Sequence, residues 1–176
     1  MTHCQKLPTP PPVITSQKQG QPRKQSTIHI SVVPVADAPP EFAQLIYDTL
    51  YRDWGVDYDP IEQWYSGSLG GRFVVAHSDD DNLVGLCRLM PAMDSNPAVL
   101  QIRQVVVDDS KQGLGIGRKI MLAVQDLAKS EGTKELFLWS RYPAYGFYQG
   151  LGYDFFSEEW ISSLTHINYR TMRKLL

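Results

Sequence analysis

The sequence has few of the residues and patterns that mark disulfide-rich, metal-dependent or membrane-spanning proteins. Its 176 residues include two cysteines and no Cys-x-x-Cys pair, so we expect neither a disulfide framework nor a zinc site. No run of 18 apolar residues indicates a membrane span. The 17 basic and 19 acidic residues nearly cancel, which argues against a dedicated nucleic-acid-binding protein. We therefore expect a soluble, cytoplasmic globular protein without a metal.

The first 26 residues differ in composition from the rest. They hold five of the 12 prolines, four basic residues and no acidic residue. Such a segment cannot bury enough apolar surface to offset its ordering entropy, which predicts a disordered tail over residues 1–26 and one domain over 27–176. A transit peptide is the alternative, because targeting segments are also poor in acids. The domain keeps 13 basic and 19 acidic residues, which mildly favours cationic partners.

The apolar periodicity predicts an α/β fold with a mixed, mostly antiparallel central sheet flanked by helices. Helical spacing and Pro or Gly boundaries predict helices that start at Pro39-Pro40 and Asp59-Pro60 and others over residues 114–130 and 143–151. Alternating or β-branched runs predict strands at residues 27–35, 72–77, 83–89, 98–107, 135–139, 153–156 and 168–173. The element order is β-α-α-β-β-β-α-β-α-β-β.

A glycine-rich turn joins the predicted strand 98–107 to the predicted helix 114–130. Gly113, Gly115 and Gly117 alternate there, and glycines allow a ligand to approach the backbone closely. The first N–H groups of a helix lack internal partners and carry a partial positive charge, so the turn suits a phosphate. The turn matches neither the Walker phosphate-binding pattern nor the GxGxxG dinucleotide-binding pattern, because Arg118 stands where each pattern requires glycine.

Two motifs in this order resemble those of the GCN5-related N-acetyltransferases, the GNAT family. Gln112, Gly115 and Gly117 match the acyl-CoA loop pattern [RQ]-x-x-G-x-[GA]. A second pattern, A-x-x-F-Y-x-x-x-G-[FY], matches at Ala144, Phe147, Tyr148, Gly152 and Tyr153. The resemblance implies the acyl-CoA N-acyltransferase fold and acetyl transfer from acetyl-CoA to an amine, by direct attack in a ternary complex.

Within the family, the sequence is similar to an ElaA-like branch. That branch has an arginine before the A-x-x-F-Y helix, as Arg141 stands here, and a His-x-x-Met ending. Here His166 and Met172 are further apart.

The resemblance also implies which residues hold the cofactor and which protonates the leaving thiolate. The pantetheine would pair with the predicted strand 98–107 where it splays from the next strand, and the pyrophosphate would lie on the glycine loop. Tyr148 occupies the family position of the catalytic acid, and a tyrosine hydroxyl can donate to a nascent thiolate. The cofactor-binding residues so implied are Val105, Val106, Val107, Gln112, Gly113, Leu114, Gly115, Ile116, Gly117, Arg118 and Arg141.

The resemblance does not extend to the general base. Several family members have a glutamate on the fourth strand, and the comparable position here is Gln101, which cannot take a proton. The remaining candidates, or a water, are Asp94, Glu158, Glu159 and His166. Of these, His166 has the most suitable ordinary pKa.

The acceptor is left open by the sequence, with a polyamine, amino sugar, antibiotic, peptide N-terminus or lysine as alternatives. Aromatic and acidic side chains that could surround an amine fall where the family places acceptor-contacting helices: Trp54, Asp57, Tyr58, Asp59, Glu62, Trp64 and Tyr65. We expect a small-molecule or peptide amine as partner and no nucleic acid or membrane. The sequence leaves the oligomeric state open, with a homodimer as one alternative. A non-catalytic acyl-CoA-binding module and a nucleotide-phosphate binder remain alternative functions.

Overall fold

A computed structural model describes residues 27–55, 70–92, 96–163 and 166–176 of the chain. These residues form an eight-stranded sheet in the order β1-β2-β3-β4-β5-β8-β6, with β7 paired to β8. The strands are β1 (His29–Pro34), β2 (Arg72–His77), β3 (Leu83–Pro91), β4 (Val99–Val107), β5 (Glu135–Ser140), β6 (Asp154–Phe155), β7 (Trp160–Ile161) and β8 (Asn168–Leu175). The α-helices are α1 (Pro40–Ile46), α3 (Ile116–Ser130) and α4 (Tyr145–Gln149). Shorter turns of helix are η1 (Val35–Asp37), η2 (Tyr47–Tyr51), η3 (Arg52–Trp54), η4 (Asp109–Lys111) and η5 (Tyr142–Ala144).

The predicted fold class is confirmed, and all neighbouring strands pair antiparallel except β4 and β5. The seven predicted strands and three of the four predicted helices are present; β2 has the predicted bounds, and the other elements have shifted ends. Helix α3 begins two residues later than predicted, because Gly115 takes the left-handed conformation (φ 78°) ahead of it. The predicted helix from Asp59 and the predicted tail lie outside the described residues, and β7 was not predicted.

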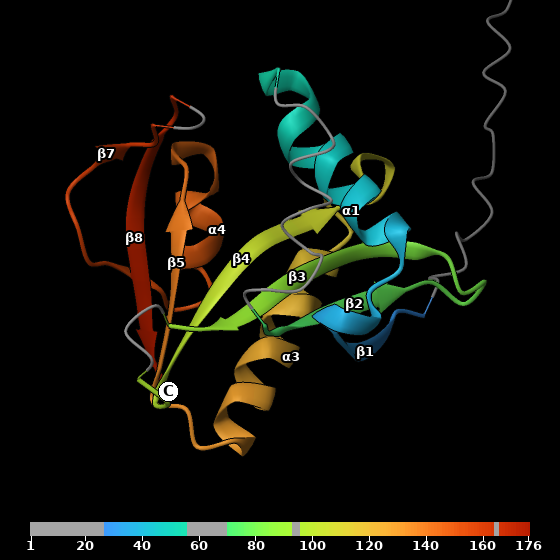
Figure 1. Cartoon of the computed structure of the whole chain (residues 1–176), viewed down its shortest axis with the longest axis horizontal. Helices are drawn as coiled ribbons and strands as arrows, with labels where there is room; N and C mark the ends of the chain where they lie inside the picture. The colour runs from blue at the N-terminus through green and yellow to red at the C-terminus, as the bar shows by residue number, and fades with distance from the viewer. Residues whose placement is uncertain (1–26, 56–69, 93–95, 164–165) are drawn as a thin grey trace, which may run out of the picture.

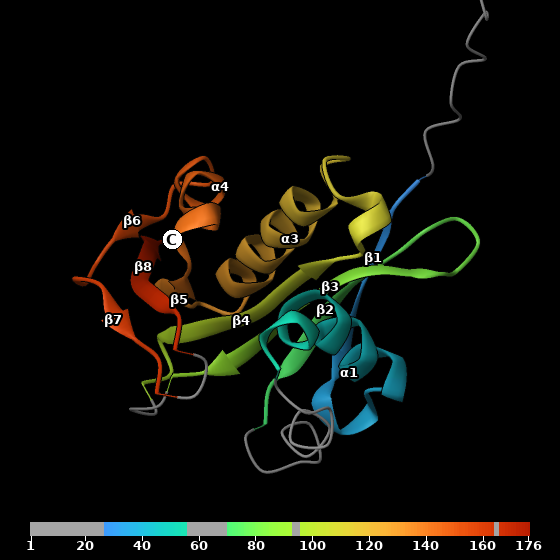
Figure 2. The same ribbon diagram turned by 90° about the horizontal axis from the view of Figure 1, so that it is seen from above.

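Helix α3 covers one face of the sheet (Figure 2). Its buried side chains Ile120, Met121 and Val124 pack against strand residues such as Val74 and Leu89. The same core cluster includes Tyr148 of α4 and the neighbouring Tyr153. One apolar stripe on α3 therefore fixes the helix on the sheet and connects it to the packing of α4.

Helix α1 covers the opposite face (Figure 2). Phe42, Ala43 and Ile46 form a second core cluster with Phe73 and other strand residues. The rings of Phe42 and Phe73 meet edge to face, with centroids 5.3 Å apart. Because helices cover both faces of β2 and β3, this part of the sheet is a rigid base for the strands beside it.

Strands β4 and β5 pair over only part of their length. Their parallel register runs from Val99 opposite Glu135 to Ile102 opposite Leu138 and then ends. Beyond that point the two strands diverge (Figure 1). A bulge between β3 and β4 coincides with the separation, and Gln104 has a φ of 51° there. The splay of β4 from β5 that the family resemblance implied is present, and it opens one edge of β4 between the two halves of the sheet.

Cys87 lies on β3 and is completely buried within the α3-side core cluster. Burial raises the pKa of its thiol to about 12. A neutral, enclosed thiol is not a nucleophile, so Cys87 acts as a core residue.

This burial predicts a loss of stability in alkaline solution. The folded-state pKa of Cys87 lies above the ordinary value of 9.0, so the folded state favours the neutral thiol. The contribution of this preference to the free energy of unfolding is complete below pH 9 and falls as the pH rises toward 12. By pH 10 the loss is about 1.4 kcal/mol. Urea unfolding of the wild type and of Cys87→Ala at pH 7.5 and pH 10 should show this extra loss in the wild type alone. Equal losses in both proteins would contradict the expected burial effect.

Candidate active site

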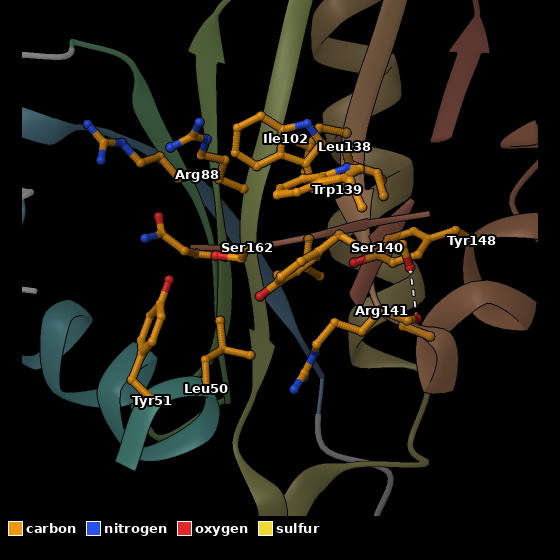
Figure 3. Close-up of a pocket in the computed structure, with 16 residues that line it drawn as sticks. Leu50, Tyr51, Arg88, Ile102, Leu138, Trp139, Ser140, Arg141, Tyr148 and Ser162 are labelled. Carbon is orange, nitrogen blue, oxygen red and sulfur yellow. Dashed lines mark hydrogen bonds between the residues drawn. The ribbon is translucent and has the colours of Figure 1, made fainter. Parts of the chain in front are cut away.

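A pocket opens where β4 and β5 separate (Figure 3). Its cavity volume is about 360 Å³, within the range of small-molecule sites. Among the described residues, side chains from η2, β3, β4, β5, α4, β7 and β8 line it. The pocket thus lies at the junction of segments that are far apart in the sequence.

A bulge in β4 lies at the pocket. Ile102, Arg103, Gln104 and Val105 all line the cavity, and Val105 also packs against the α3-side core. The positive φ of Gln104 marks the irregularity in the strand. The side-chain oxygen of Gln104 is buried without a hydrogen-bond partner in the described part of the chain. The Gln104 side chain also hydrogen-bonds Tyr51, which offsets part of the rise that burial causes in the pKa of the Tyr51 hydroxyl.

Tyr148 reaches the pocket from α4, with 8% of its surface exposed. Its ring packs against Phe147 and Tyr153, with centroids 5.0 Å and 6.1 Å away. Burial raises the pKa of its hydroxyl far above 10, and the positive charge of Arg141 opposes part of that rise. Tyr148 is therefore a protonated hydrogen-bond donor at every physiological pH.

Tyr145, three residues earlier, faces elsewhere. Its hydroxyl donates to a carboxylate oxygen of Glu159 over 3.4 Å, and its ring packs edge to face on Phe155. Tyr145 does not line the pocket. The two tyrosines thus have separate surroundings, although they lie on one short helix.

Aromatic residues form one wall of the pocket. Trp139 meets Trp160 edge to face with centroids 5.3 Å apart, and Trp160 stacks on Tyr169 at 5.2 Å. The guanidinium of Arg103 lies over the ring of Trp139, 4.5 Å from its centroid. Strand β7 supplies Trp160, so a strand that the sequence analysis missed completes this wall.

The glycine loop leads from the end of β4 into α3. Gly113 and Gly115 have φ values of 76° and 78°, which side-chain-bearing residues adopt only with strain. The Gln112 side chain donates to the carbonyl of Val107 (3.3 Å) and to Asp109 (2.8 Å), which ties the loop to the strand. Lys119 is the first α3 residue whose N–H reaches the helix backbone, at the Gly115 carbonyl. The preceding amides at the start of α3 are thereby left for an anion.

The predicted cofactor residues divide between these two regions. Val105 and Arg141 line the pocket, whereas residues 112–118 form the loop at the other end of the open strand. Val106 is buried in the α1-side core, and Val107 packs partly against the α3-side core. The arrangement is a continuous open strand with a glycine loop at one end and Tyr148 near the other.

None of the described candidates for a general base lines the pocket. Glu158, Glu159 and His166 are exposed, and Glu159 is bonded to Tyr145. Gln101 is fully buried on β4 and does not line the pocket either. Asp94 lies outside the described residues. Within the described part of the chain, no group of three His, Cys, Asp or Glu residues is placed to hold a metal ion.

Most of the residues predicted to contact the acceptor lie outside the described part of the chain. The six at positions 57–65 lie outside the described residues, and the backbone of Trp54 belongs to η3. The sequence analysis missed Arg88, Arg103 and Trp139, which do line the pocket. Nothing in a local pattern marks them, because the β3–β4 register sets Arg88 opposite Arg103 and the fold of the sheet brings Trp139 of β5 against Arg103.

No helix in the described part of the chain is both long and apolar enough to cross a membrane. No curated protein matches the sequence. Three solved structures share the fold along most of this chain at identities below 20%.

The first is Escherichia coli ElaA, with 17% identity and a TM-score of 0.68, covering 84% of this chain and 99% of ElaA. An acyl-CoA N-acyltransferase from Pseudomonas aeruginosa has 16% identity and a TM-score of 0.67, with coverages of 84% and 99%. An IAA acetyltransferase from Bacillus cereus has 19% identity and a TM-score of 0.61, with coverages of 85% and 100%.

The family model described as the acetyltransferase (GNAT) family matches residues 40–153, which is more than half of the chain. This stretch runs from α1 to Tyr153 and includes the open edge of β4, the glycine loop and Tyr148. With the fold shared by the three structures, the match confirms the predicted family: the chain belongs to the GNAT acetyltransferases.

Proposed function

We propose that this protein transfers an acetyl group from acetyl-CoA to an amine by direct attack within a ternary complex. The observation that carries the proposal is the open edge of β4, which has a glycine loop at one end and the buried hydroxyl of Tyr148 beside the other. A thioester that extends along this edge would bring its reacting carbon into the pocket.

The chain's own groups fit acetyl-CoA. Backbone N–H and C=O groups of Val105, Val106 and Val107 lie beyond the last β4–β5 pair, so they suit a ligand that adds as a strand. Amides of residues 112–118 suit the pyrophosphate, because the loop ends at a helix N-terminus. When bound, acetyl-CoA supplies a thioester carbonyl that a neutral amine can attack.

Tyr148 and Arg141 act on the leaving group. The amine nitrogen forms the new C–N bond, the C–S bond breaks, and the sulfur leaves with the electron pair. Tyr148 donates its hydroxyl hydrogen bond to that sulfur, and its raised pKa favours donation over full ionisation. Arg141 lies near enough to lower the pKa of Tyr148 electrostatically, so its positive charge also stabilises the negative charge that develops on the leaving sulfur.

The acceptor must lose one proton during the reaction. The described lining contains no carboxylate and no imidazole, so we assign this proton to a water in the pocket.

A non-catalytic acyl-CoA-binding module is the second candidate. The favouring observation is Gln101, which stands at the family's β4 base position and is fully buried without access to the pocket. Such a module would bind acetyl-CoA but would release no CoA when amines are added.

Acetyl-CoA should stabilise the folded chain strongly. A ligand at 100 times its dissociation constant adds about 2.7 kcal/mol to the free energy of unfolding. Thermal unfolding with acetyl-CoA, ATP or NAD measures this effect, and only acetyl-CoA should raise the midpoint. A larger shift with ATP or NAD would instead favour the nucleotide-phosphate binder.

Substitution of Gly115 by alanine should weaken acetyl-CoA binding. Gly115 and Gly132 lie at opposite ends of α3 with φ values of 78° and 79°, and neither has an atom within 4 Å of an added Cβ. Gly115→Ala and Gly132→Ala should therefore cost the same stability, about 1–2 kcal/mol. Titration calorimetry should show weaker acetyl-CoA binding in Gly115→Ala alone. Equal affinities in both variants would remove the loop from the cofactor site.

Tyr148→Phe should lower kcat by about 10²-fold while acetyl-CoA binding is retained, because the ring packing stays and only the donor is lost. Tyr145→Phe is the matched control, since Tyr145 lies on the same helix and points away from the pocket. Steady-state CoA release with any accepted amine measures both variants. An unchanged kcat in Tyr148→Phe would exclude this tyrosine from the mechanism.

A further inference from the structure

The pocket is lined from both faces of the sheet at the point where β4 and β5 separate. Tyr148 reaches it from α4 and belongs to the core cluster on the α3 side. Tyr51 reaches it from η2, which follows α1, and packs against the core cluster on the other side. Figure 3 shows the two tyrosines on opposite sides of the pocket. A ligand that enters along β4 therefore lies between them.

A π-helical turn carries Tyr51. The N–H of Arg52 donates to the carbonyl of Tyr47, five residues back, where an α-helix would bond four residues back. Such turns are rare and occur frequently at functional sites. Tyr47, at the start of the turn, packs against the α1-side core and does not line the pocket. Of the two tyrosines in this turn, only Tyr51 reaches the cavity.

The hydroxyl of Tyr51 is held at the bulge of β4. It hydrogen-bonds the side chain of Gln104, the residue whose φ is 51°. Burial raises the pKa of this hydroxyl, and the bond to Gln104 and the positive charges of Arg103 and Arg141 oppose part of that rise. The hydroxyl therefore stays protonated at physiological pH. A neutral phenol is both a donor and an acceptor, so it can serve a ligand N–H while it remains bonded to Gln104.

The open edge of β4 sets the directions from which a bound thioester is reached. A ligand that adds as a strand lies in the plane of the sheet, because its hydrogen bonds to β4 run in that plane. An amine attacks a thioester carbon from above or below the plane of the carbonyl. Tyr148 lies on the α3 side, where the proposed function has it donate to the sulfur. The α1 side, where Tyr51 lies, is therefore the side for the amine.

We infer that Tyr51 holds the acceptor amine: its hydroxyl oxygen accepts a hydrogen bond from the attacking N–H on the α1 side of the thioester. The inference rests on the proposed acetyl transfer and adds the group that orients the nucleophile. A neutral amine bound through its N–H keeps its lone pair for the thioester carbon. An uncharged acceptor suits this amine, because a carboxylate in its place would favour the unreactive ammonium.

Two acetyl-CoA analogues that differ in one group test this contact without turnover. Carboxamidomethyl-CoA and acetonyl-CoA both carry a CH2–C=O unit on the sulfur, which ends in NH2 in the first and in CH3 in the second. Titration calorimetry should show that the wild type binds the amide about three- to tenfold more tightly, because only the amide has an N–H for Tyr51. Equal affinities, or tighter binding of the ketone, would overturn the inference.

Variants assign the preference to one hydroxyl. Tyr51→Phe should abolish it and leave the affinity for acetyl-CoA unchanged. Tyr47→Phe is the matched control, because Tyr47 lies on the same turn and does not line the pocket. Tyr169→Phe removes the hydroxyl of another tyrosine of the described lining. Both of these variants should keep the preference. A preference that persists in Tyr51→Phe, or that Tyr47→Phe or Tyr169→Phe also loses, would overturn the assignment.

Turnover tests the same contact on real acceptors. Benzylamine, L-phenylalanine and spermidine are offered at saturating acetyl-CoA, and CoA release is followed. For each amine that the wild type acetylates, Tyr51→Phe should lower kcat/KM by about tenfold or more, because the nitrogen is no longer held at the thioester. Tyr47→Phe should retain the wild-type value. Equal kcat/KM in the wild type and Tyr51→Phe would overturn the inference and leave acetyl transfer intact.

The two measurements separate failure of the inference from failure of the proposed function. If no amine is acetylated but the preference for the amide is present and is lost in Tyr51→Phe, the N–H contact stands and acetyl transfer fails. If acetyl-CoA binds and the two analogues bind equally, only the inference fails. If acetyl-CoA itself does not bind, the proposed function fails and the inference fails with it.

Discussion

The end of β4–β5 pairing at Ile102 and Leu138 is the constraint on which the rest of the structure depends. Continued pairing would close the sheet and leave no open backbone for an extended ligand. Unpaired backbone groups cost about 1–3 kcal/mol each when they are buried. The bulge at Gln104 accompanies the separation, and residues 102–105 of β4 line the opening. The opening is therefore the polar, accessible end of an otherwise closely packed sheet.

The packing on both faces of the sheet allows it to open without losing its shape. Helix α3 and α1 bury opposite faces of β2 and β3, so the arginines and the glycine loop emerge from a rigid base. Tyr148 belongs to the α3-side core as well as to the pocket lining. The same burial that holds its ring raises the pKa of its hydroxyl and keeps it protonated. Packing and the proposed chemistry thus share one side chain.

Charge illustrates how local structure outweighs composition. The predicted domain is acidic, but the described pocket lining is basic, because β3, β4 and the segment after β5 each contribute an arginine. Net charge describes long-range attraction, which salt screens beyond roughly 10 Å. A pocket instead acts on its ligand at contact distance, where the identity of each lining residue decides. The acceptor therefore has to be inferred from the site.

The sequence by itself determined the mixed sheet with seven of its eight strands, three of its helices, the glycine loop and the family. These features depend on local patterns: alternation in β2, apolar spacing in α3, glycines at positions 113–117 and the motif around Tyr148. Only the tertiary structure decided that Arg88 and Arg103 lie opposite each other, that β7 brings Trp160 against Trp139, and that Glu158, Glu159 and His166 lie outside the pocket. The physical reason is that register, bulges and strand separation arise from contacts between distant segments, and no local pattern records them.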